Sequence, residues 1–109
     1  MAILTLKERD AIAVKKRRDA LSRVRVLLAD VAREYGGQFW LFGSASRGDI
    51  RKDSDIDLVA DFPLDVERRA VCAAESACAQ ANIPCDIVER RTCSDRFWTI
   101  ISPDLTAIP

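Results

Sequence analysis

Three aspartates and one glycine-serine turn are the residues of this sequence whose types and spacing point to chemistry. Asp55 and Asp57 alternate with Ile56 and Leu58 in a short apolar run that predicts a strand. Because side chains alternate across a strand, both carboxylates lie on one face, near enough to share a hard divalent cation such as Mg²⁺. The alternative is that one of the two aspartates caps a turn and the other is a solvated residue at the edge of a sheet. Apolar neighbours commit the strand to the core, where aspartate is disfavoured, so a metal site is the better interpretation.

A third carboxylate, Asp86, lies in the next run with strand character, Cys85 to Val88. An aspartate between two apolar neighbours is out of place in a strand unless it meets a cation or a hydrogen-bond donor. The pattern predicts that Asp86 is a third metal ligand and a general base. The alternative is a strand-end aspartate that accepts a hydrogen bond from a neighbouring loop.

Gly43 and Ser44 follow a run of aromatic and aliphatic residues, Gln38 to Phe42, that predicts a buried strand. Glycine lets the backbone approach a ligand closely, and a turn into a helical segment at Ser44 would aim backbone N–H groups and a hydroxyl at a phosphate. Glycine-serine turns are common, so only the nearby aspartates make this a phosphate site. Arg47 is a candidate to neutralise phosphate charge through its planar guanidinium, or else a surface arginine of a helix.

The elements that must position these side chains begin with a helix. Thr5 and Glu8 fit a capping box, and neither proline nor glycine interrupts the sequence until Gly36, although a break between Leu6–Lys16 and the rest stays open. The other expected elements are strands at Gln38–Phe42, Asp55–Ala60 and Cys85–Val88, a helix at Asp65–Ala81, a short helix capped by Ser94 and ended by Pro103, and an irregular tail to Pro109.

This order of elements predicts an α+β fold in which helices cover a small mixed sheet. At 109 residues the chain has room for one hydrophobic core, so we expect one domain over residues 1–109 with its core at about 17–102. Trp40, Phe42 and Trp98 are expected to pack rather than bind. An exposed apolar edge at Phe97-Trp98 or in the N-terminal segment would suit a homo-oligomer or a partner protein.

Composition excludes several other classes of site. The chain has no histidine, which rules out Ser-His-Asp and Cys-His catalysis and histidine-ligated metals. Its cysteines form no Cys-x-x-Cys pair and are expected to be reduced and mostly buried; they are Cys72, Cys78, Cys85 and Cys93. No apolar run approaches the roughly 20 residues of a membrane helix, and the first ten residues lack a secretory signal pattern, so a soluble cytoplasmic protein is expected.

The charge balance argues against nucleic acid as the main partner. Basic and acidic side chains number 17 each, and the formal net charge is zero. The basic run from Lys15 to Arg18 has no interleaved aromatic side chains for stacking, so it is expected to be a solvated helix face.

The combined motif resembles the minimal nucleotidyltransferase domains of the DNA polymerase beta-like superfamily, which often act as antitoxins beside HEPN-domain partners. That family has Gly-Ser, ten intervening residues and then Asp-x-Asp. The corresponding segments here are Gly43-Ser44, Ala45 to Ser54 and Asp55-Ile56-Asp57, and Arg47-Gly48 matches a common arginine-glycine element. The resemblance covers most of the chain, apart from the first and last dozen residues.

The resemblance implies a nucleotidyltransferase that uses ATP or another nucleoside triphosphate and two Mg²⁺ ions. Asp55 and Asp57 would bridge the ions, and Ser44 with the Gly43 backbone would hold the β- and γ-phosphates. Asp86 would ligate the catalytic ion and accept the proton of an attacking hydroxyl. A tyrosine or similar side chain of a HEPN-type toxin is the implied acceptor of AMP or another nucleotide.

The sequence is also compatible with two other functions. The chain would be a non-catalytic antitoxin if it neutralised its partner by contact alone, and then loss of Asp55 and Asp57 would leave neutralisation unchanged. It would add nucleotides to RNA if its binding weakened steeply with salt. The sequence assigns no residue to a base pocket.

Overall fold

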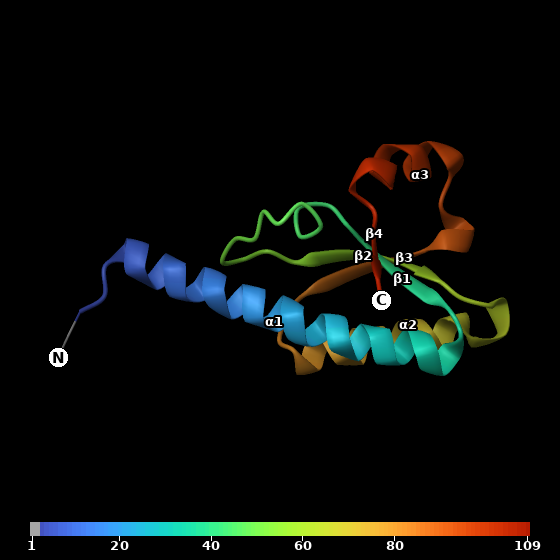
Figure 1. The fold of residues 1–109 in the computed structure, drawn as a ribbon, viewed down its shortest axis with the longest axis horizontal. Coiled ribbons are helices and arrows are strands. Elements are labelled where there is room, and N and C mark those ends of the chain that lie inside the picture. Colours follow the sequence, from blue (N-terminus) through green and yellow to red (C-terminus); the bar gives the residue numbers. More distant parts are fainter. Residues whose placement is uncertain (1–2) are drawn as a thin grey trace.

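The N-terminal helix α1 (Leu6–Tyr35) is continuous, which answers the question left open by the sequence. The computed structural model describes residues 3–109. The Thr5 side chain accepts a hydrogen bond from the Glu8 N–H at 3.1 Å, as the capping box predicts, and Gly36 ends the helix at φ 72°. The buried residues of α1 begin at Ala20, and its N-terminal half projects beyond the sheet (Figure 1).

Four strands form one mixed sheet in the order β3-β2-β1-β4. They are β1 (Gln38–Phe42), β2 (Ile56–Asp61), β3 (Cys85–Glu89) and β4 (Thr106–Ile108). β1 runs antiparallel to both β2 and β4, whereas β2 and β3 are parallel. A parallel pair needs a crossover connection, and here helix α2 (Leu64–Gln80) provides it. The predicted α+β fold with a mixed sheet is confirmed.

The two faces of the sheet are covered differently. Helices α1 and α2 lie against one face, and the short helix α3 (Asp95–Ile101) lies on the other side of the sheet (Figure 1). Side chains that alternate along β1 and β2 fill the space beneath α1 and α2; Phe39, Leu41, Ile56 and Leu58 are all fully buried there. The hydrophobic core therefore lies on the α1 and α2 face.

The expected irregular tail was wrong, because the chain ends in strand β4. A 3-10 turn, η1 (Arg90–Thr92), precedes α3, and a second, η2 (Ser102–Asp104), follows it. The Gln38 side chain donates a hydrogen bond to the Ile108 carbonyl at 2.8 Å, and Ile108 is buried in the core. The edge of β1 and the buried side chain of Ile108 thus order β4, a strand too short to be recognised from alternation in the sequence.

The cysteines are less buried than expected. Within residues 3–109 all four are free thiols, and only Cys78 is buried, while Cys85 and Cys93 are partly buried and Cys72 is exposed. Cys72 lies on the outer side of α2, where helical spacing rather than residue type decides exposure. Nowhere in the described chain is a helix both long enough and apolar enough to cross a membrane.

Candidate active site

Asp57 lies at the centre of the candidate site, where three segments meet. In the strand register it pairs with Phe42 of β1 on one side and with Asp86 of β3 on the other. Neighbouring strands are about 4.8 Å apart, and paired residues point to the same face of a sheet. The two aspartates therefore share the face opposite α1 and α2. Asp57 is half-buried, whereas Asp86 is exposed.

Asp55 lies one residue before β2 and is exposed. The sequence predicted that the strand would begin at Asp55, but ladder pairing starts at Ile56, whose N–H donates to the Pro84 carbonyl at 3.0 Å. The carboxylate of Asp55 thus belongs to the end of a loop rather than to the ladder. It still lies close enough to Asp57 to affect its ionisation.

Burial is the main cause of a raised pKa at Asp57, and the negative charges of Asp55 and Asp86 raise it further. A bound cation would reduce the repulsion among these like charges, and carboxylate oxygens are the ligands that Mg²⁺ prefers. The donor set therefore fits the ion chemically. In residues 3–109, however, no three acidic or cysteine side chains converge closely enough to hold a metal ion. Binding would require the exposed carboxylates of Asp55 and Asp86 to rotate towards Asp57.

Gly43 directly follows β1 and lies beside the Asp57 carboxylate. A Cβ atom placed on Gly43 would lie 2.6 Å from Oδ2 of Asp57, and the glycine has a φ of 74°. Both features require glycine at this position, because the left-handed backbone strains other residues and a side chain would displace the carboxylate. The turn that was predicted to approach a phosphate thus also determines where Asp57 lies.

The loop after Gly43 forms successive turns rather than the predicted helical segment at Ser44. The N–H of Arg47 donates to the Gly43 carbonyl and that of Asp49 to the Ser44 carbonyl, at 3.3 and 3.0 Å. Among the hydrogen bonds of residues 3–109, none is donated by the three N–H groups of residues 44–46. A run of free amides beside a carboxylate cluster suits a phosphate oxygen.

Arg47 lies on this loop rather than on a helix, and its guanidinium forms an ion pair with Asp104 at 2.7 Å. The Ser46 hydroxyl hydrogen bonds to the Asp104 carbonyl and to the Thr106 hydroxyl, the latter at 2.9 Å. The C-terminal segment therefore holds the loop in place. Sequence reasoning missed these contacts because they join residues about 60 positions apart.

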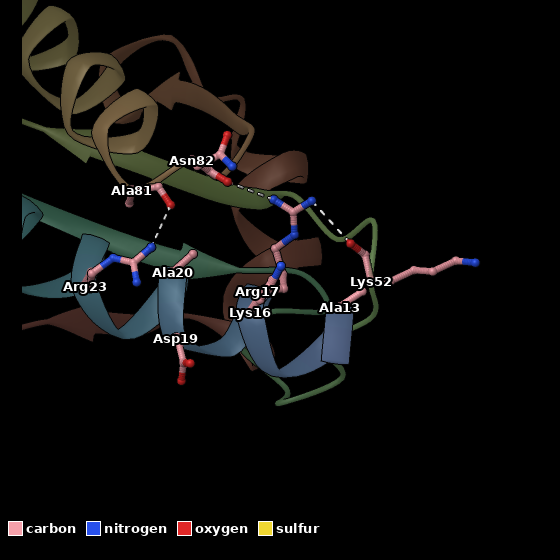
Figure 2. A pocket seen from close by; sticks show the side chains of 9 residues that line it. All are labelled: Ala13, Lys16, Arg17, Asp19, Ala20, Arg23, Lys52, Ala81 and Asn82. Atoms are coloured by element: carbon pink, nitrogen blue, oxygen red, sulfur yellow. Dashed lines mark hydrogen bonds between the residues drawn. The ribbon is translucent and has the colours of Figure 1, made fainter. Parts of the chain in front are cut away.

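Arg17 of α1 also helps to position the candidate site. The sequence did not reveal this, because the basic run around Arg17 suggested a solvated helix face. Its Nη1 donates to the Asn82 carbonyl and its Nη2 to the Lys52 carbonyl, both at 3.3 Å (Figure 2). Lys52 precedes Asp55 by three residues, and Asn82 precedes Asp86 by four. One guanidinium thus joins the two segments that lead into the candidate ligands. It lines a cavity of about 320 Å³ between α1 and these segments.

Aromatic side chains cover the same face as Asp57, as their predicted packing role requires. Phe42 packs edge-on against Phe97 of α3 at 5.9 Å between ring centroids. The Arg90 guanidinium lies 4.0 Å from the ring centroid of Trp98. The Nε1 of Trp40 is buried and has no hydrogen-bond partner within residues 3–109. Helix α3 therefore closes one side of the face, next to the carboxylates.

The fold and this carboxylate-bearing face are typical of a phosphoryl-transfer domain, and comparison with known proteins identifies the family. Residues 24–102 match the family described as nucleotidyltransferase domain. Because the match covers most of the chain, the protein belongs to the nucleotidyltransferase domain family. No curated protein matches the sequence significantly.

Two solved structures match this chain over most of its length. One is described as a toxin-antitoxin with AMP-PNP; the match covers 78% of this chain and 72% of that chain, with 19% identity and a TM-score of 0.62. The other is a Sulfolobus solfataricus protein with an inferred nucleotidyltransferase function. It matches over 87% of this chain and 84% of its own, with 18% identity and a TM-score of 0.47, which is too low to establish a shared fold. The first match supports the polymerase beta-like fold predicted from the sequence.

Proposed function

We propose that this nucleotidyltransferase moves AMP, or another nucleoside monophosphate, from a triphosphate to a hydroxyl group of a partner protein. The observation that carries the proposal is the register that pairs Asp57 with Asp86, with Gly43 packed against the Asp57 carboxylate. Family membership supports nucleotidyl transfer. The AMP-PNP in the similar toxin-antitoxin structure supports an adenine nucleotide as the donor.

In the proposed reaction the acceptor oxygen attacks the α-phosphorus of the triphosphate. A new oxygen–phosphorus bond forms, the bond from the α-phosphorus to the bridging oxygen breaks, and pyrophosphate leaves with that electron pair. Asp86 is exposed and takes the proton of the acceptor hydroxyl. The free N–H groups of residues 44–46, with the Ser44 hydroxyl, hold the β- and γ-phosphates. Arg47 would add a positive charge if the triphosphate drew its guanidinium away from Asp104.

Asp55, Asp57 and Asp86 would hold two Mg²⁺ ions against the triphosphate. Bound Mg²⁺ would neutralise the negative charge that develops on the entering and leaving oxygens. The raised pKa of Asp57 supports this assignment, because the clustered carboxylates repel one another without a cation. Three aspartates from adjacent strand ends also satisfy the preference of Mg²⁺ for oxygen ligands.

The acceptor we propose is a side-chain hydroxyl of a HEPN-type toxin, which makes the chain an antitoxin. The similar fold in a toxin-antitoxin structure supports a toxin as partner. The main alternative remains an antitoxin that neutralises its partner by contact alone. The carboxylate cluster favours catalysis, since neutralisation by contact alone needs no group of three carboxylates that repel one another.

Isothermal titration of ATP into the protein with Mg²⁺ tests the central claim. We expect saturable binding that disappears without Mg²⁺ and in the Asp55→Ala/Asp57→Ala double variant. Repeating the titration with the other nucleoside triphosphates determines the base preference. If no nucleotide bound even with the partner toxin present, the catalytic proposal would give way to neutralisation by contact.

A further inference from the structure

The outer edge of β3 offers unpaired backbone groups next to Asp86. β3 is an edge strand, with β2 as its only neighbour among the strands described. The bond from the Ile56 N–H to the Pro84 carbonyl shows that residues 84, 86 and 88 turn their backbone groups towards β2. Cys85 and Ile87 therefore turn theirs outward, and among the turn, loop and cap hydrogen bonds of residues 3–109 none uses them. Such an edge is a template for another strand.

A groove of about 480 Å³ runs along this edge, between α2 and β3. Apolar side chains line most of it; they include Val71, Cys78, Ile83 and Ile87. Among the described residues that line it, Glu75 and Asp86 are charged, and both are acidic. The groove therefore suits small apolar side chains on a segment that also carries positive charge.

The side chains of β3 alternate between the α2 side and the face of the candidate active site, and Asp86, which belongs to the second set, also borders the groove. Cys85 and Ile87 pack against the hydrophobic core on the α2 side, whereas Asp86 shares the opposite face with Asp57. A strand added at this edge would alternate in the same way. Each of its side chains on the Asp86 face would be flanked by two on the groove side.

We propose that the edge of β3 binds an extended segment of the acceptor protein as a fifth strand, with a serine, threonine or tyrosine hydroxyl beside Asp86. The inference rests on the proposed function and names the form in which the acceptor is bound. The segment has an apolar residue on each side of the hydroxyl residue, and these two residues occupy the groove. Main-chain hydrogen bonds to Cys85 and Ile87 supply affinity, and the alternating side chains supply specificity.

The binding test uses no nucleotide and no Mg²⁺, so its result does not depend on catalysis. The probe is a fluorescein-labelled peptide, Lys-Gly-Val-Tyr-Val-Gly-Lys, whose lysines and valines share the groove side; it is titrated with the whole chain and followed by fluorescence anisotropy. Two further peptides carry N-methyl groups, one on both valine amides and the other on the tyrosine amide and the glycine amide that follows the second valine. A strand hydrogen bonds through alternate amides, so we expect one methylated peptide to bind about 10-fold more weakly and the other to bind unchanged.

A protein variant tests the groove independently of the peptide backbone. Glu75→Lys reverses one of the two charges in the groove, and we expect it to weaken peptide binding several-fold. Glu34→Lys is the matched control, because Glu34 is also an exposed glutamate on a helix, and its position is outside the groove. It should leave the affinity unchanged.

Three results would overturn the inference: no peptide binding, equal weakening by both methylation patterns, or self-association that displaces the peptide as protein concentration rises. The last result, measured by sedimentation, would assign the edge to a second copy of the chain. Each of these results leaves the Mg²⁺-dependent ATP titration unaffected. Loss of ATP binding with intact peptide binding would instead contradict the proposed function alone.

Discussion

The two faces of the sheet differ in what their side chains do, although the same strands supply both. In β2, Ile56 and Leu58 are fully buried beneath α1 and α2, and Asp57 between them points to the other face. The first face is apolar and closed by two long helices. The second carries acidic side chains and is covered mainly by the short helix α3.

This difference shows how a small domain combines stability with a reactive site. Burial beneath α1 and α2 supplies the free energy of folding, which allows the opposite face to keep charges that oppose folding. At Asp57 this opposition comes from burial and from the charges of Asp55 and Asp86, which raise its pKa. Neighbouring residues of one strand should therefore respond to substitution in opposite ways.

Asp57→Asn should cause the largest functional loss. We expect nucleotidyl transfer to fall by about 10²–10³-fold, because the variant loses a charge that would hold Mg²⁺ and stabilise the transition state. In the metal-free protein the same change should raise the free energy of unfolding at neutral pH by about 1 kcal/mol or less, since Asp57 is partly solvated. Transfer assays and urea denaturation measure the two effects.

The gain in stability should depend on pH in a definite direction. A carboxyl whose pKa is raised by folding is unfavourable when charged, so it costs stability above the ordinary carboxyl pKa of about 4. The advantage of Asp57→Asn should therefore be present at neutral pH and vanish as the pH falls below that value. A variant less stable than the parent at pH 7 would show that Asp57 is held by favourable contacts instead.

Leu58→Ala, one residue further along β2, should have the opposite profile. Leu58 is fully buried, and its truncation leaves a cavity under the helices, so we expect a loss of about 3 kcal/mol in the free energy of unfolding. The affinity for ATP with Mg²⁺, measured on the folded fraction, should remain near that of the parent. A large loss of affinity at full folding would mean that the two faces are coupled.

Gly43→Ala should produce a smaller effect on both properties. An alanine here combines a strained φ of 74° with a Cβ 2.6 Å from the Asp57 carboxylate. We expect a loss of about 1 kcal/mol in stability and about 10-fold weaker binding of ATP with Mg²⁺. Thermal denaturation and isothermal titration distinguish the two losses.

Gly48→Ala is the matched control for this substitution. Gly48 has a similar φ of 78°, but a Cβ added there meets no described atom within 4 Å. It should share the loss of stability and keep the affinity for the nucleotide. Equal affinities in the two variants would remove Gly43 from the site.

The sequence predicted the acidic face because the evidence for it is local. Alternation along β2 placed Asp57 opposite Ile56 and Leu58, and an aspartate within the next strand pointed to Asp86 as its companion. The strand register then brings Asp57 and Asp86 into direct pairing. Only the start of the strand differed, since Asp55 precedes the first ladder bond.

Contacts between distant segments could not be predicted in the same way. Strand β4 has three residues and no readable alternation, and it is ordered by the edge of β1 and the Gln38 side chain. The pairing of Arg47 with Asp104 and the bridge formed by Arg17 join segments far apart in sequence. A run of basic residues has the same sequence pattern whether its side chains are solvated or donate hydrogen bonds to backbone carbonyl groups.

Arg17→Ala should give the smallest of the expected effects. Arg17 affects Asp55 and Asp86 only indirectly, through the backbone segments that precede them. The variant removes two hydrogen bonds to the segments before Asp55 and Asp86, so we expect a loss of about 1 kcal/mol in stability. Transfer should fall only several-fold, mainly in kcat, because the carboxylates remain but are less well positioned. Arg18→Ala, at the exposed neighbouring position, is the control and should leave both quantities unchanged. A variant of Arg17 that lost stability but kept full transfer would show that the bridge serves the closed face alone.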